Sequence, residues 1–292
     1  MRLFCRQLAN ELLKLFARKR TYLGFAGSLV AEALFLLLWR HPLAQRAFEK
    51  AFQRGSAGPN PFFDDYFHGL TIALLMVAFT FLLLGGLYLA LVAGDIVAKE
   101  VEDGTINMLL ARPVSRLRLW SVKWLTCSIY TFALVFFMGL TSLLLASALC
   151  GGLGKLAVVY GQHPSNLTLM SIFDTAEGLW RYGQGLLLLA IVMHVVSALA
   201  FTFSCLNMKP ATAAIATLAI FFVDAVLKVV PFFAVFEKWL LSYHLACWLR
   251  SFSKYSPAVN VTTSVVYLLA LSVIFLSVSA SQFCRRDFKT CQ

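Results

Sequence analysis

The sequence predicts an all-α integral membrane protein with six transmembrane helices, and composition alone excludes a soluble fold. Of the 292 residues, 60% are hydrophobic and 13% are charged, about half the charged share of a soluble domain. The mean hydropathy is +0.78. Six apolar runs are each about 20 residues long, the length of helix that crosses a bilayer. The same composition excludes disordered, collagen-like, coiled-coil and disulfide-dense secreted chains.

The six predicted spans cover roughly 22–39, 70–94, 124–149, 183–206, 211–236 and 261–282. We expect helices because backbone N–H and C=O groups in lipid need partners within their own segment. A membrane barrel would need alternating strands of about ten residues, which the sequence lacks. The first run follows a basic N-terminus but ends without a small-residue cleavage site, so we expect a retained span. Residues 1–292 are thus expected to form a single transmembrane domain.

The distribution of Lys and Arg predicts the orientation of the chain. The segments on the side of both termini, which include 95–123 and 207–210, hold 15 basic residues, whereas the opposite side holds 9. Basic loops stay in the cytoplasm, so we expect both termini and the 95–123 loop to be cytoplasmic. These loops explain the net charge of +11, and no nucleic-acid partner is predicted. The expected location is a cell membrane, in a bacterium the inner membrane.

Two segments outside the spans have amphipathic patterns. Within 2–17, Leu8 and Leu12 share one helical face and Lys14 lies towards the other. We expect an N-terminal interfacial helix on the cytoplasmic membrane surface, with its cations near anionic headgroups; a solvated helix packed on a partner is the alternative. On the outer side, residues 237–252 show an aromatic amphipathic pattern that suits a helix at the outer interface.

The loop over residues 100–123 is the most informative segment. Gly104 permits a sharp exit from the second span, and Thr105 is a favourable N-cap for a short helix. The acids Glu100 and Glu102, which precede it, favour the positive end of that helix. The sequence therefore predicts a short, well-marked helix at the membrane surface.

This short helix ends at a proline and carries two sets of side chains suited to docking. Pro113 disfavours helix at Arg112, and Ser115 can cap the next helix, which runs into the third span. The apolar face consists of Ile106, Leu109 and Leu110, and the basic cluster of Arg112, Arg116 and Arg118. Burying each apolar side chain against a partner contributes roughly 1.5–3 kcal/mol. A solvated helix this short has no need of such a face, so we expect it to contact another protein.

The same loop resembles the cytoplasmic loop of type-2 ABC exporter permeases. The resemblance rests on the pattern Glu-x-Glu-x-Gly-Thr-x-x-x-Leu-Leu-x-x-Pro-x-Ser-Arg, followed by Lys. It falls here on Glu100, Glu102, Gly104, Thr105, Leu109, Leu110, Pro113, Ser115, Arg116 and Lys123. In that family the loop joins the second and third of six spans, as predicted here, and acts as a coupling helix.

The resemblance implies a transmembrane permease subunit of an ATP-driven exporter. Its coupling helix would dock into a separate ATP-binding cassette subunit, and a second permease subunit, identical or homologous, would complete the transporter. The sequence has no G-x-x-x-x-G-K-[ST] motif, so ATP and Mg²⁺ are expected in the partner and no cofactor in this chain. The chain itself is not expected to be an enzyme.

Three charged residues lie inside the predicted spans, where a charge costs about 2.5–3.5 kcal/mol at the bilayer centre. Asp224 and Lys228 are four residues apart on the fifth span, so they share one helix face, acid first. They form either a self-neutralising ion pair or a polar patch on a transport path. Glu32 in the first span has no basic residue within four positions, so it is protonated, paired with another helix or lining the path. Pro231, three residues beyond Lys228, predicts a kink nearby in the fifth span.

Other functions lack the residues they need. An ATP-independent secondary transporter or channel is the alternative, which inverted repeats or broken half-helices would favour. A membrane enzyme would need His, Asp or Glu clustered at span ends, and no catalytic or metal-binding residue is predicted. His194 in the fourth span is either a hydrogen-bonded interhelix histidine or a contact for metal or substrate. Seven scattered cysteines without C-x-x-C spacing predict no disulfide framework.

Overall fold

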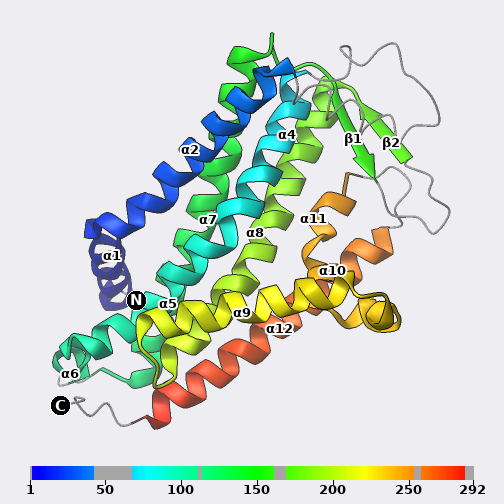
Figure 1. The fold of residues 1–292 in the computed structure, drawn as a ribbon. Helices are drawn as coiled ribbons and strands as arrows, with labels where there is room; N and C mark the ends of the chain where they lie inside the picture. Colours follow the sequence, from blue (N-terminus) through cyan, green and yellow to red (C-terminus); the bar gives the residue numbers. More distant parts are fainter. Residues whose placement is uncertain (1, 43–67, 111–113, 161–168, 253–257, 287–292) are drawn as a thin grey trace.

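The computed structural model describes residues 2–42, 68–110, 114–160, 169–252 and 258–286, a bundle of long helices (Figure 1). Six helices in this part are long and apolar enough to cross a membrane. They are α2 (Lys19–Arg40), the run α4 (Gly69–Thr80), η1 (Phe81–Gly85) and α5 (Gly86–Glu102), and then α7 (Arg116–Leu149), α8 (Thr175–Cys205), α9 (Pro210–Val229) and α12 (Ala258–Arg285). The coarse prediction, a helical multi-pass membrane protein, is confirmed.

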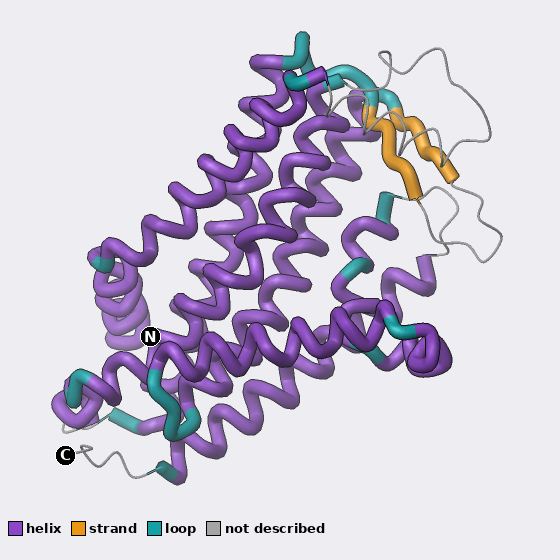
Figure 2. The backbone as a smooth tube through the Cα atoms, viewed as in Figure 1, coloured by secondary structure: helices purple, strands orange, loops and turns teal. Residues whose placement is uncertain are grey.

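Shorter elements lie at the ends of the long helices and in the segments that connect them. They are α1 (Arg2–Ala17), α6 (Thr105–Leu110), β1 (Leu156–Tyr160), β2 (Leu169–Phe173), η2 (Pro231–Trp239), α10 (Leu241–Leu245) and α11 (Cys247–Arg250). We call the end that holds α1, α6 and the last residues of α12 the terminal face. The opposite end, which holds β1 and β2, is the hairpin face (Figure 2).

The β-hairpin is a departure from the predicted all-α fold. Strands β1 and β2 pair antiparallel, with Leu156 opposite Phe173 and Tyr160 opposite Leu169. Both strands are rich in β-branched and aromatic residues, which favour strands over helix. The loop before β1 also completes the start of α4, because Leu70 N–H donates to the Leu153 carbonyl at 2.8 Å. The hairpin is thereby fixed to the second span.

The fifth span ends earlier than the predicted 211–236. Helix α9 stops at Val229, Val230 is extended with φ −78° and ψ 119°, and the 3₁₀-helix η2 begins at Pro231. Proline has no N–H to donate and disfavours helix at the residue before it. The predicted end at 236 is therefore wrong. The sequence predicted a kink near Pro231, and the structure has a complete break of the helix there.

The second span contains a π-helical turn, η1, between α4 and α5. Gly85 lies where the span meets α8: a Cβ at this position would be 2.5 Å from Met193 Cε. Farther along, the Ser204 hydroxyl of α8 donates to the Gly94 carbonyl at 2.6 Å and accepts from the Ala98 N–H at 2.9 Å. A neighbouring side chain therefore takes part in the hydrogen-bond ladder of α5.

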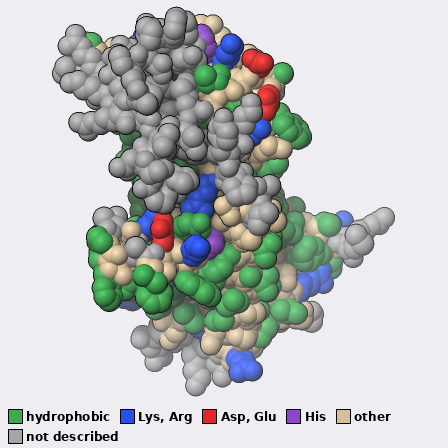
Figure 3. All heavy atoms as spheres, turned by 90° about the vertical axis from the view of Figure 1, so that its right-hand side faces the viewer, with side chains coloured by type: hydrophobic (Ala, Val, Ile, Leu, Met, Phe, Trp, Pro, Cys, Tyr) green, Lys and Arg blue, Asp and Glu red, His purple; other side chains and the backbone are tan. Residues whose placement is uncertain are grey.

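Helix α8 forms the centre of the bundle and packs on α5, α7, α9 and α12. Its buried face includes Ala190, Ala198 and Ala200, and small residues let membrane helices approach closely. Helices α9 and α12 are much less buried and present large apolar side chains to their surroundings. From the side of the hairpin and α10, the lower half of the molecule is mostly hydrophobic with scattered charges (Figure 3). Lipid is the solvent that such a surface requires.

Candidate functional site

The predicted coupling segment folds as α6 and is attached to the end of α5. Gly104 has a φ of 68°, in the left-handed region that favours glycine, so the chain can turn sharply after Glu102. Thr105 begins α6, and its hydroxyl donates to the Glu100 carbonyl at 3.3 Å. Ile106 is 1% exposed and packs in the hydrophobic core. The expectation that Ile106 docks on a partner is therefore wrong, because this side chain is already buried within the chain.

Four charged side chains meet next to α6, and we call Glu11, Lys14, Glu100 and Lys123 the ion cluster. Lys123 Nζ lies 2.6 Å from Glu100 Oε2 and 3.1 Å from Glu11 Oε2. Lys14 Nζ binds the other oxygen, Glu100 Oε1. The side chains of Glu100 and Lys123 are 2% and 0% exposed. Each buried charge thus has an opposite charge in contact, which burial of ions requires.

The ion cluster joins three elements that are far apart in sequence. Glu11 and Lys14 lie on α1, Glu100 on the last turns of α5, and Lys123 on α7. Glu100 and Lys123 also stand at the two ends of the resemblance motif, so the turn that contains α6 is closed at its base by an ion pair. Glu100 and Lys123, two charged residues of the motif, therefore stabilise the fold of this chain.

The remaining motif residues surround α6. Ser115 occupies the N-cap position of α7, as predicted, but its side chain makes no capping hydrogen bond. Leu109 and Leu110 lie in the last turn of α6. Arg112 and Pro113 fall outside the described residues.

Arg116 binds the end of another helix. Its Nη1 donates to the carbonyl oxygens of Cys284 at 2.9 Å and Arg286 at 2.8 Å, where α12 ends. Arg286 Nη1 in turn donates to the carbonyls of Cys205 at 3.2 Å and Leu206 at 2.9 Å, where α8 ends. Cations at a helix C-terminus satisfy carbonyls that lack an intrahelical partner. The two arginines therefore connect the start of α7 to the ends of α12 and α8.

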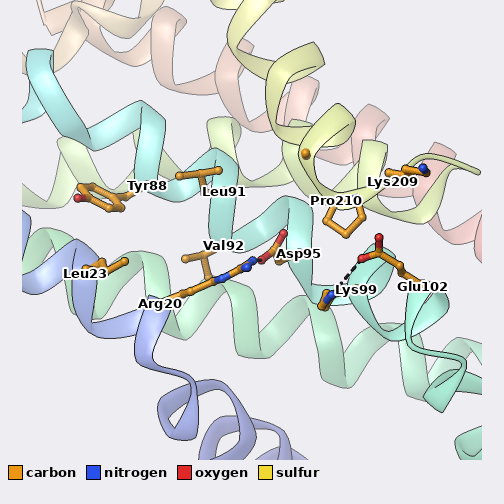
Figure 4. Close-up of a pocket in the computed structure, with 11 residues that line it drawn as sticks. Arg20, Leu23, Tyr88, Leu91, Val92, Asp95, Lys99, Glu102, Lys209 and Pro210 are labelled. Atoms are coloured by element: carbon orange, nitrogen blue, oxygen red, sulfur yellow. Dashed lines mark hydrogen bonds and ion pairs between the residues drawn. The ribbon is translucent and has the colours of Figure 1, made fainter.

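A pocket of about 550 Å³ lies between α2, α5 and the start of α9 (Figure 4). Its chemistry changes along its length. The apolar end is lined by Leu23, Tyr88 and Leu91, and the charged end by Lys99, Glu102 and Lys209. Between them lie Arg20 and Asp95. The pocket therefore suits a molecule that is apolar at one end and polar at the other.

Most charges that line the pocket are paired. Arg20 Nη1 lies 3.2 Å from Asp95 Oδ2, and Lys99 Nζ lies 3.1 Å from Glu102 Oε2. Lys209 forms no ion pair within 4.0 Å in the described part of the chain, and its side chain is exposed at the start of α9. Lys99 Nζ also lies 3.3 Å from Asp103 Oδ1, so this lysine is shared between two acids. Among the described lining residues, Lys209 is thus the one charged side chain without an ion-pair partner.

Glu32 is buried between α2 and α7. Its Oε1 accepts hydrogen bonds from Thr141 Oγ1 at 3.0 Å and Ser142 Oγ at 2.9 Å, and the side chain is fully buried. Its Oε2 is buried without a hydrogen-bond partner among the described residues. Of the interpretations left open by the sequence, this geometry favours contact with another helix through hydroxyl groups. Glu32 does not line the pocket.

Asp224 and Lys228 do not form the predicted ion pair. Asp224 Oδ1 accepts the N–H of Leu241 at 2.9 Å, and Oδ2 accepts that of Ser242 at 2.5 Å. No ion pair within 4.0 Å joins Asp224 to Lys228 in the described structure. The pairing is wrong because the carboxylate instead satisfies two free N–H groups at the start of α10. The outer amphipathic segment is accordingly divided into η2, α10 and α11 and held against α9.

His244 fixes this outer segment to α12. Its Nδ1 lies 3.1 Å from Ser264 Oγ, its Nε2 lies 2.9 Å from the Lys238 carbonyl, and its ring stacks on Tyr267 with centroids 4.0 Å apart. Burial lowers the pKa of His244 below its usual value, and the Lys238 carbonyl opposes this in part. The imidazole therefore acts as a structural link between η2, α10 and α12.

His194 packs against aromatic rings on α7. Its ring centroid lies 4.7 Å from that of Trp124 and 5.8 Å from that of Phe132, and Nδ1 is buried without a partner among the described residues. In the described ranges, no group of three or more His, Cys, Asp or Glu side chains is placed to hold a metal ion.

Sequence reasoning missed the partners that organise both sites. Glu11 and Lys14 supply half of the ion cluster, and Arg20 and Asp95 pair across the pocket. The available signal was an acid and a lysine three residues apart on the amphipathic N-terminal helix, together with charges just outside two apolar runs. Which of these charges meet depends on how the helices pack.

Comparison with known families matches most of the chain. A family model described as "Protein of unknown function (DUF2705)" covers residues 33–289, so the chain belongs to this family. No curated protein matches the sequence.

Proposed function

We propose that this member of the DUF2705 family is the transmembrane permease subunit of an ATP-driven ABC exporter. In this proposal a separate ATP-binding subunit binds ATP and Mg²⁺ and performs the hydrolysis. A second permease subunit, identical or homologous, completes the transporter. The terminal face is then cytoplasmic, and α1 lies in the membrane interface.

The ion cluster is the observation that carries the proposal. Glu100 and Lys123, at the two ends of the motif that resembles a coupling loop, are 2.6 Å apart. Because this contact closes the turn, α6 would move together with the ends of α5 and α7, and the contact of Lys14 with Glu100 would add α1 to the same body. Force on α6 would reach two spans at once, as a rigid-body coupling between a partner and a membrane bundle requires.

The exposed side of α6 gives a revised docking contact. Ile106 faces inward, whereas Met108 is 76% exposed. Burial of one such side chain in a partner's groove contributes roughly 1.5–3 kcal/mol. We therefore place Met108, in the exporter proposal, at the contact with the ATP-binding subunit.

Purification of the tagged full-length chain from its own membrane tests the proposal. The wild type should co-purify with a protein that carries an ATP-binding cassette, and the complex should hydrolyse ATP in lipid. Met108→Asp should reduce this co-purification about tenfold or more, because a charge then replaces the buried side chain. Met208→Asp is the matched control, since Met208 is 38% exposed in the loop between α8 and α9.

Two outcomes would count against the proposal. If no ATP-binding cassette protein co-purifies with the wild type, the exporter function fails and an ATP-independent secondary transporter or channel replaces it. If Met108→Asp and Met208→Asp reduce co-purification equally, the docking contact is not on α6.

A further inference from the structure

We infer that the pocket between α2, α5 and α9 binds a single-chain amphiphile with an anionic headgroup, which enters from the membrane leaflet at the terminal face. If this amphiphile is also the exported substrate, that further step rests on the proposed function. Binding itself is a property of this chain.

The apolar end of the pocket fits a hydrocarbon chain. Leu23 on α2 and Leu91 on α5 line it and remain exposed, so this end opens sideways between two spans. Both residues lie within helices that are apolar enough to cross a membrane, so in a bilayer this opening would face lipid chains. The volume of about 550 Å³ lies in the usual range for a small-molecule site. A lipid-like chain can therefore enter without crossing water.

The charged end favours an anion because the groups there that remain free to form hydrogen bonds are donors. Asp95 and Glu102 are each already in contact with a cation, at 3.2 and 3.1 Å. Arg20 uses one of its five N–H donors on Asp95 and is 72% exposed. The Lys209 ammonium has no ion-pair partner among the described residues. A phosphate or carboxylate headgroup would accept from either of these free donors, and a guanidinium is well shaped for phosphate.

The start of α9 adds to this preference. Lys209 is the N-cap, its side chain makes no capping bond, and Pro210 and Ala211 line the pocket. The N-terminus of a 20-residue helix carries partial positive charge. The helix end thus reinforces the donors of Arg20 and Lys209, and no acid without a cation lies among the described lining residues.

Photo-crosslinking on the purified full-length chain, without any ATP-binding subunit, tests the inference. The chain is placed in phosphatidylcholine nanodiscs with one of two probes that share a diazirine-labelled acyl chain. One probe is lysophosphatidylglycerol and the other is lysophosphatidylcholine. After illumination, mass spectrometry maps the adducts. We expect adducts at Leu23, Tyr88 or Leu91 with the anionic probe, about fivefold above the zwitterionic one, the effect of one accessible ion pair.

Matched substitutions separate the pocket from general lipid contact. Lys209→Gln should reduce the anionic adducts about fivefold, whereas Lys228→Gln, near the other end of α9, should leave them unchanged. Leu91→Trp should block labelling of the pocket by both probes. Leu269→Trp, at an exposed position on α12, should not. Elution as a monodisperse species checks that each variant is folded.

Equal labelling by both probes, or labelling unaffected by Lys209→Gln, would overturn the anionic specificity. Adducts spread over α12 as much as over the pocket would overturn the site. Specific labelling in a chain that co-purifies with no ATP-binding cassette protein would leave this inference standing and refute the exporter. Co-purification with an ATP-binding cassette protein but without specific labelling would support the exporter and refute this inference.

Discussion

Glu100 at the terminal face and Glu32 inside the bundle are both buried acids, but they are stabilised in opposite ways. Glu100 has an ammonium group against each carboxylate oxygen, whereas Glu32 has two hydroxyl donors on one oxygen and none among the described residues on the other. The first arrangement needs the charge, because it holds Lys14 and Lys123 together. The second needs an acceptor only. Burial alone therefore does not tell what an acid contributes.

Removal of Glu100 should have the largest effect. Glu100→Ala leaves Lys123 buried beside Glu11 alone, and loss of one partner from a buried ion pair costs roughly 3–5 kcal/mol. Thermal unfolding of the purified protein in detergent measures the loss. Glu102→Ala is the control, because Glu102 is half-exposed and its pair with Lys99 contributes about 0–1 kcal/mol. Equal losses in the two variants would show that the ion cluster is not buried as described.

A double substitution should recover part of that loss. Glu100→Gln combined with Lys123→Met removes an opposite pair, so the coupling energy in a double-mutant cycle should be about 1–3 kcal/mol. The same unfolding assay on the two single variants and the double variant gives this value. A coupling energy of zero would mean that Glu100 and Lys123 act independently. It would contradict the interpretation that their ion pair closes the turn that contains α6.

Substitutions at Glu32 should separate acceptor from charge. Glu32→Gln keeps an oxygen for Thr141 and Ser142 and should change the unfolding free energy by less than about 1 kcal/mol. Glu32→Leu removes that acceptor and leaves the Ser142 hydroxyl unpaired, at a cost of about 1–3 kcal/mol. Unfolding measurements on both variants provide the comparison. If Gln is as harmful as Leu, Glu32 requires its charge and resembles Glu100 after all.

Asp224 should matter more than Lys228. Asp224→Ala leaves two N–H groups at the start of α10 without their acceptor. Loss of such a cap lowers the free energy of unfolding by about 1 kcal/mol. Lys228→Ala should stay within about 0.5 kcal/mol, as at an ordinary surface position. Protease accessibility of the segment around α10 reports the same change locally. Equal effects of the two substitutions would instead support the Asp224–Lys228 ion pair that the sequence predicted.

The smallest expected effect is a pH dependence from His244. Because burial lowers its pKa in the folded protein, the unfolded chain takes up the proton first as pH falls. The stability that neutral His244 contributes is thus present above about pH 6.5 and declines below it. Unfolding temperatures between about pH 7.5 and 5.5 should fall more steeply for the wild type than for His244→Gln. Parallel curves would show that His244 is not a buried link.

The sequence was sufficient for the six helices, because long apolar runs in lipid have few other ways to satisfy their backbone. Local chemistry also predicted the turn at Gly104 and a kink near Pro231. Contacts between elements were harder to predict from the sequence. Asp224 has an attractive lysine one turn away, yet N–H groups 17 and 18 residues farther along offered it better partners.

The apolar pattern of α6 shows the same limit. Spacing places Ile106 on an apolar face, but it cannot say whether that face meets a partner or the chain's own core. The pocket could not be predicted either, because its walls come from three helices separated by long stretches of sequence. Residue spacing constrains one helix at a time, and sites between helices depend on packing.

The connection through Arg116 and Arg286 has a consequence for biosynthesis. Arg286 is translated after all six helices, yet it supplies donors to the end of α8 and an acceptor to Arg116 at the start of α7. Both helices are therefore synthesised before Arg286, which binds the end of α8 and the Arg116 side chain. Assembly of the terminal face must wait for the last helix to insert. A chain cut before Cys284 would keep nearly all of α12, yet the carbonyls at the end of α8 would lack the Arg286 donors and the Arg116 guanidinium would lack its acceptors.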